Sequence, residues 1–166
     1  MEREFHASWG KPLRVLSALS LGILMLIVIL GLATGPRHLW IWRVAMIGAP
    51  LFVAIAALPF MVRGYTLTGG SLVVHRLGFD TTLPLDDLRS VRGVAGDVAG
   101  SVRLFGNGGL FSITGWFWNR RLGRYRAYAT DFDRAVLLEF GRRKVVVTPH
   151  DPQAFIVQVR RQFALR

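Results

Sequence analysis

Aromatic and basic side chains gather between residues 116 and 126 in a pattern that could bind a membrane surface. Three consecutive aromatic residues, Trp116, Phe117 and Trp118, stand just before a group of arginines. These arginines are Arg120, Arg121, Arg124 and Arg126. Tryptophan favours the boundary between water and lipid, and each arginine can add about 1 kcal/mol of attraction to an anionic leaflet. The segment therefore predicts a site that binds the membrane surface or an anion.

The same segment has a second interpretation. It could be a loop folded back over a sheet, with its aromatic rings in the core and its arginines in water. Gly106-Asn107-Gly108-Gly109, shortly before it, favours a hairpin turn over a phosphate-binding loop, because the Lys-Ser/Thr ending of a phosphate loop is missing. The sequence leaves both the core and the membrane interpretation of residues 116–126 open.

Catalytic chemistry has little support elsewhere in the chain. The histidines, His6, His38, His75 and His150, are scattered, and no pair of them has the helical spacing of a metal site. No serine lies in a nucleophile-elbow motif, and the chain has no cysteine. The sequence therefore predicts a protein that is not an enzyme and that uses neither a cofactor nor a metal.

The charge balance indicates an anionic partner. The 166 residues include 21 Lys and Arg against 10 Asp and Glu, which gives a net charge of +11. The arginines do not form a continuous basic arm, and the sequence holds no nucleic-acid-binding motif. We therefore expect a membrane surface, with a possible anionic lipid, as the partner of this charge, and no nucleic acid.

Two apolar segments near the N-terminus indicate how the chain is placed relative to a membrane. Residues 15–33 carry neither charge nor proline, and residues 39–62 carry one charge, Arg43. Nineteen helical residues span about 28 Å, close to the thickness of a bilayer core. A buried hairpin of a soluble protein is the alternative, but neither segment has a polar face. We predict a cytoplasmic N-terminal segment at 1–14, a transmembrane helical hairpin at 15–62 and a separate domain at 63–166.

The domain after residue 62 has the pattern of a β-rich fold that ends in one helix. Short alternating segments separated by glycine and aspartate turns predict strands. Asp151-Pro152 is typical of a helix start, and an apolar stripe follows at helical spacing. The stripe consists of Phe155, Ile156, Val159 and Phe163. The helix is expected to pack on the sheet.

Residues 65–163 resemble the bacterial pleckstrin-homology-like (PH-like) domains of small membrane proteins. The matching pattern includes Tyr65, Leu67, Leu72, Val74, Leu83-Pro84-Leu85, Leu88, Val91, Arg103, Gly106, Leu122-Gly123, Tyr125, Ala129-Thr130, Thr148-Pro149, Asp151-Pro152 and Phe155. Thr148 stands where the family normally has a serine. The resemblance implies two nearly orthogonal antiparallel sheets with seven strands in all, and one end covered by the C-terminal helix.

Three functions follow from this organisation. The first is a non-catalytic, membrane-anchored module that binds a protein partner or self-associates through its sheet edges or loops. The second is recognition of anionic lipid headgroups by the arginine-rich segment. The third is an accessory subunit of a membrane transporter, docked through the helical hairpin.

Flanking charge predicts the orientation of the hairpin. Five basic residues flank its open end, namely Arg3, Lys11, Arg14, Arg63 and Arg76, and two, Arg37 and Arg43, lie at the connection. Because basic loops stay inside, both termini and the PH-like domain should be cytoplasmic, in a multi-pass protein of the cell membrane. Reporter fusions at residue 37 and after residue 166 should report opposite sides of the membrane. Activity of the C-terminal fusion outside the cell would contradict this orientation.

Overall fold

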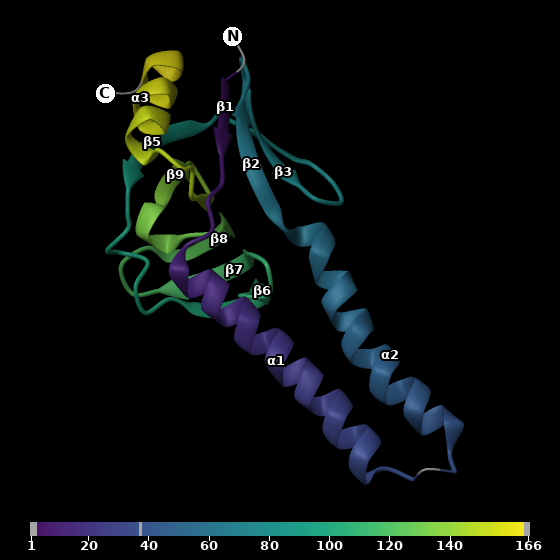
Figure 1. Cartoon of the computed structure of the whole chain (residues 1–166). Helices are drawn as coiled ribbons and strands as arrows, with labels where there is room; N and C mark the ends of the chain where they lie inside the picture. Colours follow the sequence, from purple (N-terminus) through teal and green to yellow (C-terminus); the bar gives the residue numbers. More distant parts are fainter. Residues whose placement is uncertain (1–2, 37, 165–166) are drawn as a thin grey trace.

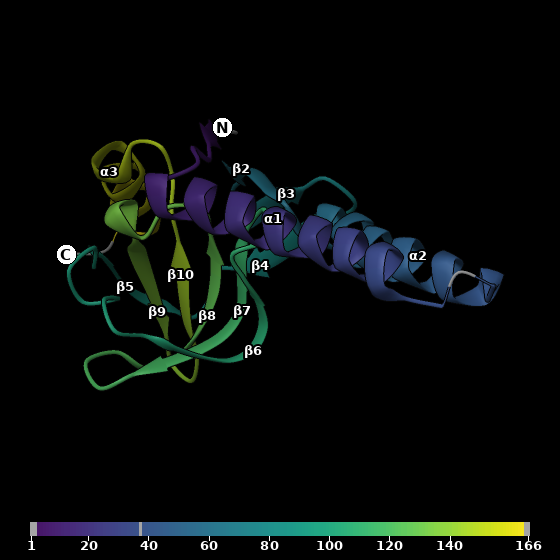
Figure 2. The same ribbon diagram turned by 60° about the horizontal axis from the view of Figure 1, so that its bottom comes forward.

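The computed structural model describes residues 3–36 and 38–164. Arg37, at which the topology experiment places a reporter, lies outside the described residues. Figure 1 shows a long hairpin of two helices that extends away from a β domain, and Figure 2 shows the same separation from a second direction. The third helix, α3 (Pro152–Phe163), packs on the β domain.

The hairpin consists of α1 (Lys11–Thr34) and α2 (Trp40–Ala57), and α2 continues into the short 3₁₀ helix η1 (Leu58–Phe60). The two helices are long and apolar enough to cross a membrane, with mean hydropathies of 2.8 and 2.0. Only 6% of each apolar window is buried, so the rest of the described chain does not cover them. Near their connection the indole nitrogen of Trp42 donates a hydrogen bond of 2.8 Å to the carbonyl oxygen of Gly31.

A short N-terminal strand, β1 (Arg3–His6), joins the β domain and was missed by the sequence analysis. It pairs in antiparallel fashion with β2 (Val62–Leu67), so that Phe5 lies opposite Tyr65. The ring of Phe5 meets the ring of Phe155 edge-on at 5.1 Å. The helical hairpin is therefore an insertion between two neighbouring strands, and part of the segment 1–14 belongs to the sheet.

The strands form two sheets. The first has the order β1-β2-β3-β4, with β3 at Ser71–Arg76 and β4 at Thr81–Pro84. The second has the order β5-β9-β10-β8-β7-β6. Its strands are β5 (Leu88–Gly93), β6 (Val102–Gly108), β7 (Ile113–Asn119), β8 (Gly123–Ala129), β9 (Val136–Phe140) and β10 (Lys144–Val147).

This architecture confirms the predicted fold class, an apolar helical hairpin followed by a PH-like domain with a C-terminal helix. Two details differ from the expectation. The described residues form ten strands where seven were expected, and β8 pairs with β10 in parallel. The additional strands come from β1 and from β6 and β7 in the glycine-rich region, where frequent glycines conceal the strand pattern.

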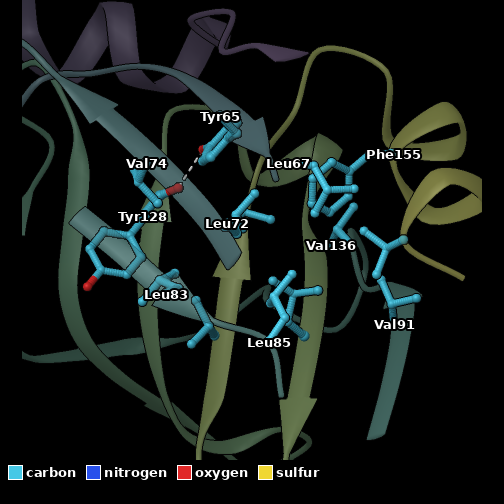
Figure 3. Packing of buried hydrophobic residues seen from close by; sticks show 14 of the residues in the cluster. Tyr65, Leu67, Leu72, Val74, Leu83, Leu85, Val91, Tyr128, Val136 and Phe155 are labelled. Atoms are coloured by element: carbon cyan, nitrogen blue, oxygen red, sulfur yellow. Dashed lines mark hydrogen bonds between the residues drawn. The ribbon is translucent and has the colours of Figure 1, made fainter. Parts of the chain in front are cut away.

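The main core lies between the two sheets and under α3. Leu72 and Val136 are fully buried there, together with the ring of Phe155 (Figure 3). The Tyr65 hydroxyl donates a hydrogen bond of 2.6 Å to the carbonyl oxygen of Tyr128, which links the two sheets. Burial raises the pKa of Tyr65 to about 12. The predicted start of α3 is confirmed, because the Asp151 carboxylate accepts a hydrogen bond from the backbone N–H of Ala154.

A second core covers the opposite face of the six-stranded sheet, and the beginning of α1 is part of it. Leu13 is 1% exposed and belongs to the cluster that contains Phe117 and Tyr125. One turn further along, the Ser17 hydroxyl donates to the carbonyl oxygen of Gly109 at 2.8 Å and accepts from the backbone N–H of Phe111 at 3.0 Å. The first turns of α1 are therefore held by the β domain.

Leu13→Ala should lower the free energy of unfolding of the full chain by about 2–5 kcal/mol, because it opens a cavity in this second core. Chemical denaturation in mild detergent, followed by tryptophan fluorescence, measures the loss. Leu19→Ala is the matched control, since Leu19 is 58% exposed on the same helix. Equal effects of the two substitutions would show that α1 does not pack on the domain.

Candidate functional site

The three consecutive aromatic residues lie on a strand, so the prediction of a loop at this position is wrong. In β7 the side chains of Trp116 and Trp118 point to one face of the sheet and that of Phe117 to the other. Phe117 is 4% exposed and stacks on Tyr125 at 5.9 Å in the second core. Trp118 is exposed and Trp116 is half-buried. The core interpretation therefore holds for Phe117, whereas Trp116 and Trp118 lie on the other face of the sheet.

The arginines of the predicted site are divided between that face and a distant turn. Arg124 and Arg126 lie on β8 opposite Trp118 and Trp116. The guanidinium of Arg124 lies 4.5 Å from the centre of the Trp116 ring, which is the geometry of a cation–π contact. Arg124 and Arg126 therefore lie with the two tryptophans on the face of the β7–β8 pair that is opposite the second core.

Arg120 and Arg121 occupy the turn between β7 and β8, and both are exposed. Arg121 forms an ion pair of 3.2 Å with Asp97. Hydrogen bonds from Arg92 and Arg121 hold the pKa of the Asp97 carboxyl below its usual value. This turn is at the end of β7 away from Gly109, which contacts α1, and the strand is about 20 Å long. Arg120 and Arg121 therefore lie far from the base of the helical hairpin.

A cavity of about 660 Å³ lies between the end of α2 and the face of β6, β7 and β8 that lies opposite the second core. One wall is apolar and includes Phe52, Val53 and Ala56 of α2. The other wall carries three arginines from different strands, together with the rings of Trp116 and Tyr128. These arginines are Arg76 on β3, Arg103 on β6 and Arg126 on β8. Of the seven residues predicted for the site, Trp116 and Arg126 line the cavity.

The floor of the cavity includes two glycines that face each other across strands β6 and β7. Gly106 and Gly115 are register partners, and their φ angles are 114° and 137°. Residues other than glycine rarely adopt such angles. A Cβ on Gly115 would also lie 2.8 Å from the Cα of Gly106. The close approach of the two strands thus requires glycine at both positions.

Arg76 is the most buried charge at this cavity. It is 9% exposed, and its guanidinium lies 4.6 Å from the ring of Phe79 and 4.9 Å from the ring of Tyr128. Burial lowers the pKa of Arg76, and the nearby charge of Arg126 acts in the same direction. Within the described residues, the Nε of Arg76 and the hydroxyl of Tyr128 are buried without a hydrogen-bond partner.

Arg76 was predicted only as a charge flanking the hairpin and not as a site residue, although its strand carries the signal. Leu72, Val74 and Arg76 alternate with half-buried residues along β3, so the charge stands on the apolar, inward face. A charged residue on such a face marks either a buried ion pair or a ligand site. Arg103 gives no comparable signal, because its strand is concealed by glycines.

Two further observations concern the titratable side chains outside the cavity. Among residues 3–36 and 38–164, no group of three or more His, Asp or Glu side chains could hold a metal ion. On the first sheet, the hydroxyl of Thr66 lies 2.7 Å from Nε2 of His75, whose Nδ1 lies 3.0 Å from the Asp80 carboxylate. This hydrogen-bonded chain ties Asp80, in the segment before β4, to strand β2.

Fold and cavity together define a small β-sandwich domain of the PH-like class, with an apolar helical hairpin inserted near its N-terminus. Comparison with known families gives the same answer, since the model of the family described as Bacterial PH domain matches residues 63–163. The chain belongs to this family. PH domains are generally non-catalytic, and the match includes no catalytic family. No curated protein matches the chain.

Gly115→Ala should destabilise the domain by about 1–3 kcal/mol, because it forces an unfavourable φ and a backbone clash on the β6–β7 pair. Chemical denaturation of the full chain in mild detergent measures the change. Gly96→Ala is the control, because a Cβ at Gly96 would meet open space, and it should change stability by less than about 0.5 kcal/mol. An unchanged free energy of unfolding in Gly115→Ala would mean that the two strands can move apart at this point.

Proposed function

We propose that this chain is a non-catalytic, membrane-anchored PH-like module that binds a protein partner, or a second copy of itself, along the free edge of its larger sheet. In this proposal α1 and α2 cross the cell membrane and the β domain lies on the cytoplasmic side. The low burial and high hydropathy of both helices support the anchor. The excess of basic residues at the open end of the hairpin supports the orientation.

The exposed apolar edge strand β6 is the observation that carries the proposal. Val102, Leu104 and Phe105 are 58%, 54% and 78% exposed on this strand. β6 is the last strand of its sheet, so one side of its backbone has no strand neighbour among the described residues. Soluble proteins usually protect such edges with charges, proline or a covering element. β6 carries one charged residue, Arg103, and its pairing with β7 is irregular between Arg103 and Phe105. The exposed apolar residues on either side of Arg103 suit the addition of a strand from a partner.

The opposite edge of the same sheet is protected. β5 lies against α3, and the guanidinium of Arg160 donates a hydrogen bond of 3.2 Å to the carbonyl oxygen of Val91. This contrast favours β6 over β5 as the edge for strand addition. Anchoring in a membrane also confines the domain to two dimensions, which raises the effective concentration of a weakly bound partner.

Val102→Glu combined with Leu104→Glu should abolish the association, because two buried charges would oppose strand pairing at the edge. The measurement is chemical cross-linking in membranes, followed by purification in mild detergent and identification of what remains bound. Since both residues are exposed, the variant should keep its thermal stability within a few degrees.

Val157→Glu is the matched control, because Val157 is 64% exposed on α3. It should leave the association intact. A cross-linked species of twice the chain mass would identify a second copy as the partner, and a heavier species a different protein. A partner that is retained equally by the β6 variant would contradict the edge proposal and favour docking through the helical hairpin, as in an accessory subunit of a transporter.

A further inference from the structure

We propose that the cavity between α2 and strands β6–β8 binds the phosphate headgroup of an anionic phospholipid, with an acyl chain along the apolar wall of α2. This site shares strand β6 with the proposed protein-binding edge, since Arg103 and Phe105 line it. It rests on the membrane anchor of the proposed function but not on the proposed protein interaction. Its volume of about 660 Å³ is typical of small-molecule sites in proteins.

The first argument is the charge of the cavity. Arg76, Arg103 and Arg126 line it, and no Asp or Glu is among the described residues of its lining. Within the described chain, none of the three arginines forms an ion pair. Three arginines that line one cavity without a counter-ion leave its positive charge uncompensated, and phosphate oxygens can accept hydrogen bonds from several guanidinium groups.

The second argument is the unpartnered polar atoms. The Nε of Arg76 and the hydroxyl of Tyr128 are buried and lack a hydrogen-bond partner in the described structure. Figure 3 shows the Tyr128 hydroxyl directed away from the other labelled core side chains. A buried guanidinium without a counter-charge costs stability, and an anion in the cavity beside Arg76 would offset that cost.

The third argument is the position of the apolar wall. Phe52, Val53 and Ala56 belong to the helix that is long and apolar enough to cross a membrane. From Phe52 to Phe60 the chain rises about 12 Å along the helix direction. The cavity therefore extends from an acyl-chain environment to the arginines, which is the order of groups in a phospholipid. A free phosphate would leave this apolar wall without a contact.

The absence of acidic groups in the described lining also selects the headgroup. Zwitterionic headgroups carry an ammonium group, which would meet three arginines and no carboxylate. A headgroup with net negative charge avoids this repulsion. The cavity should therefore prefer phosphatidylglycerol to phosphatidylcholine.

The test uses the full chain in a non-ionic detergent. Its Tm is measured while phosphatidylglycerol, phosphatidylcholine or glycerol 3-phosphate is added. Phosphatidylglycerol should raise the Tm, because a ligand that binds the folded state stabilises it. Phosphatidylcholine should raise it little. Glycerol 3-phosphate should bind more weakly than the lipid, because it lacks the acyl chains.

Arg126→Gln and Arg103→Gln should each weaken the binding of phosphatidylglycerol about tenfold or more, the effect of losing one charge-assisted hydrogen bond. Both residues are exposed, so these variants should fold even if Arg76→Gln does not. Arg120→Gln removes the same charge from the distant turn and should leave binding unchanged.

Three results would overturn the proposal. Equal stabilisation by phosphatidylcholine would exclude recognition of the anionic headgroup. An equal loss of binding in Arg120→Gln would indicate a general attraction of charge instead of a cavity. Binding of glycerol 3-phosphate as tight as that of phosphatidylglycerol would make this a site for a soluble phosphate.

Discussion

The pairing of β1 with β2 is the constraint on which the rest of the structure depends. These strands are neighbours in the first sheet, yet the whole helical hairpin separates them in the sequence. Both ends of the hairpin must therefore start at one place on the domain. Leu13 and Ser17 add a second attachment on the larger sheet. The domain is thus tied to the hairpin by packing on α1 and by the continuation of α2 into β2, and its orientation relative to the helices is restricted.

The cavity is a consequence of this attachment. The four-stranded sheet and α3 cover one face of the larger sheet only over part of its width. The outer strands β6, β7 and β8 continue beyond that cover, and the end of α2 lies over them on its way into β2. A close packing of helix on sheet would need large side chains at the contact. Gly106, Gly115 and Ala56 leave room there instead.

The sequence predicts the parts of the fold whose signal is local. The two helices follow from long apolar segments, and α3 follows from the Asp151-Pro152 start and its stripe. β1 has a mixed four-residue sequence, and only its partner Tyr65 sixty residues later makes it a strand. β6 and β7 contain glycines, and the close approach that requires them is visible only once the two strands are paired. Information of this kind is set by distant contacts and cannot be read from a short window.

The prediction for residues 116–126 shows why neighbouring residues in a sequence need not form one site. Alternation along β7 and β8 sends Phe117 into the core while Trp116 and Arg126 reach the cavity. The turn places Arg120 about 13 Å beyond Trp116 along the strand direction. Charges in solution are screened beyond about 8 Å at physiological ionic strength. An anion in the cavity would therefore interact with Arg126 on β8, Arg103 on β6 and Arg76 on β3 of the other sheet. It would interact only weakly with Arg120. The charge that matters for such a ligand is gathered by the fold from three distant strands.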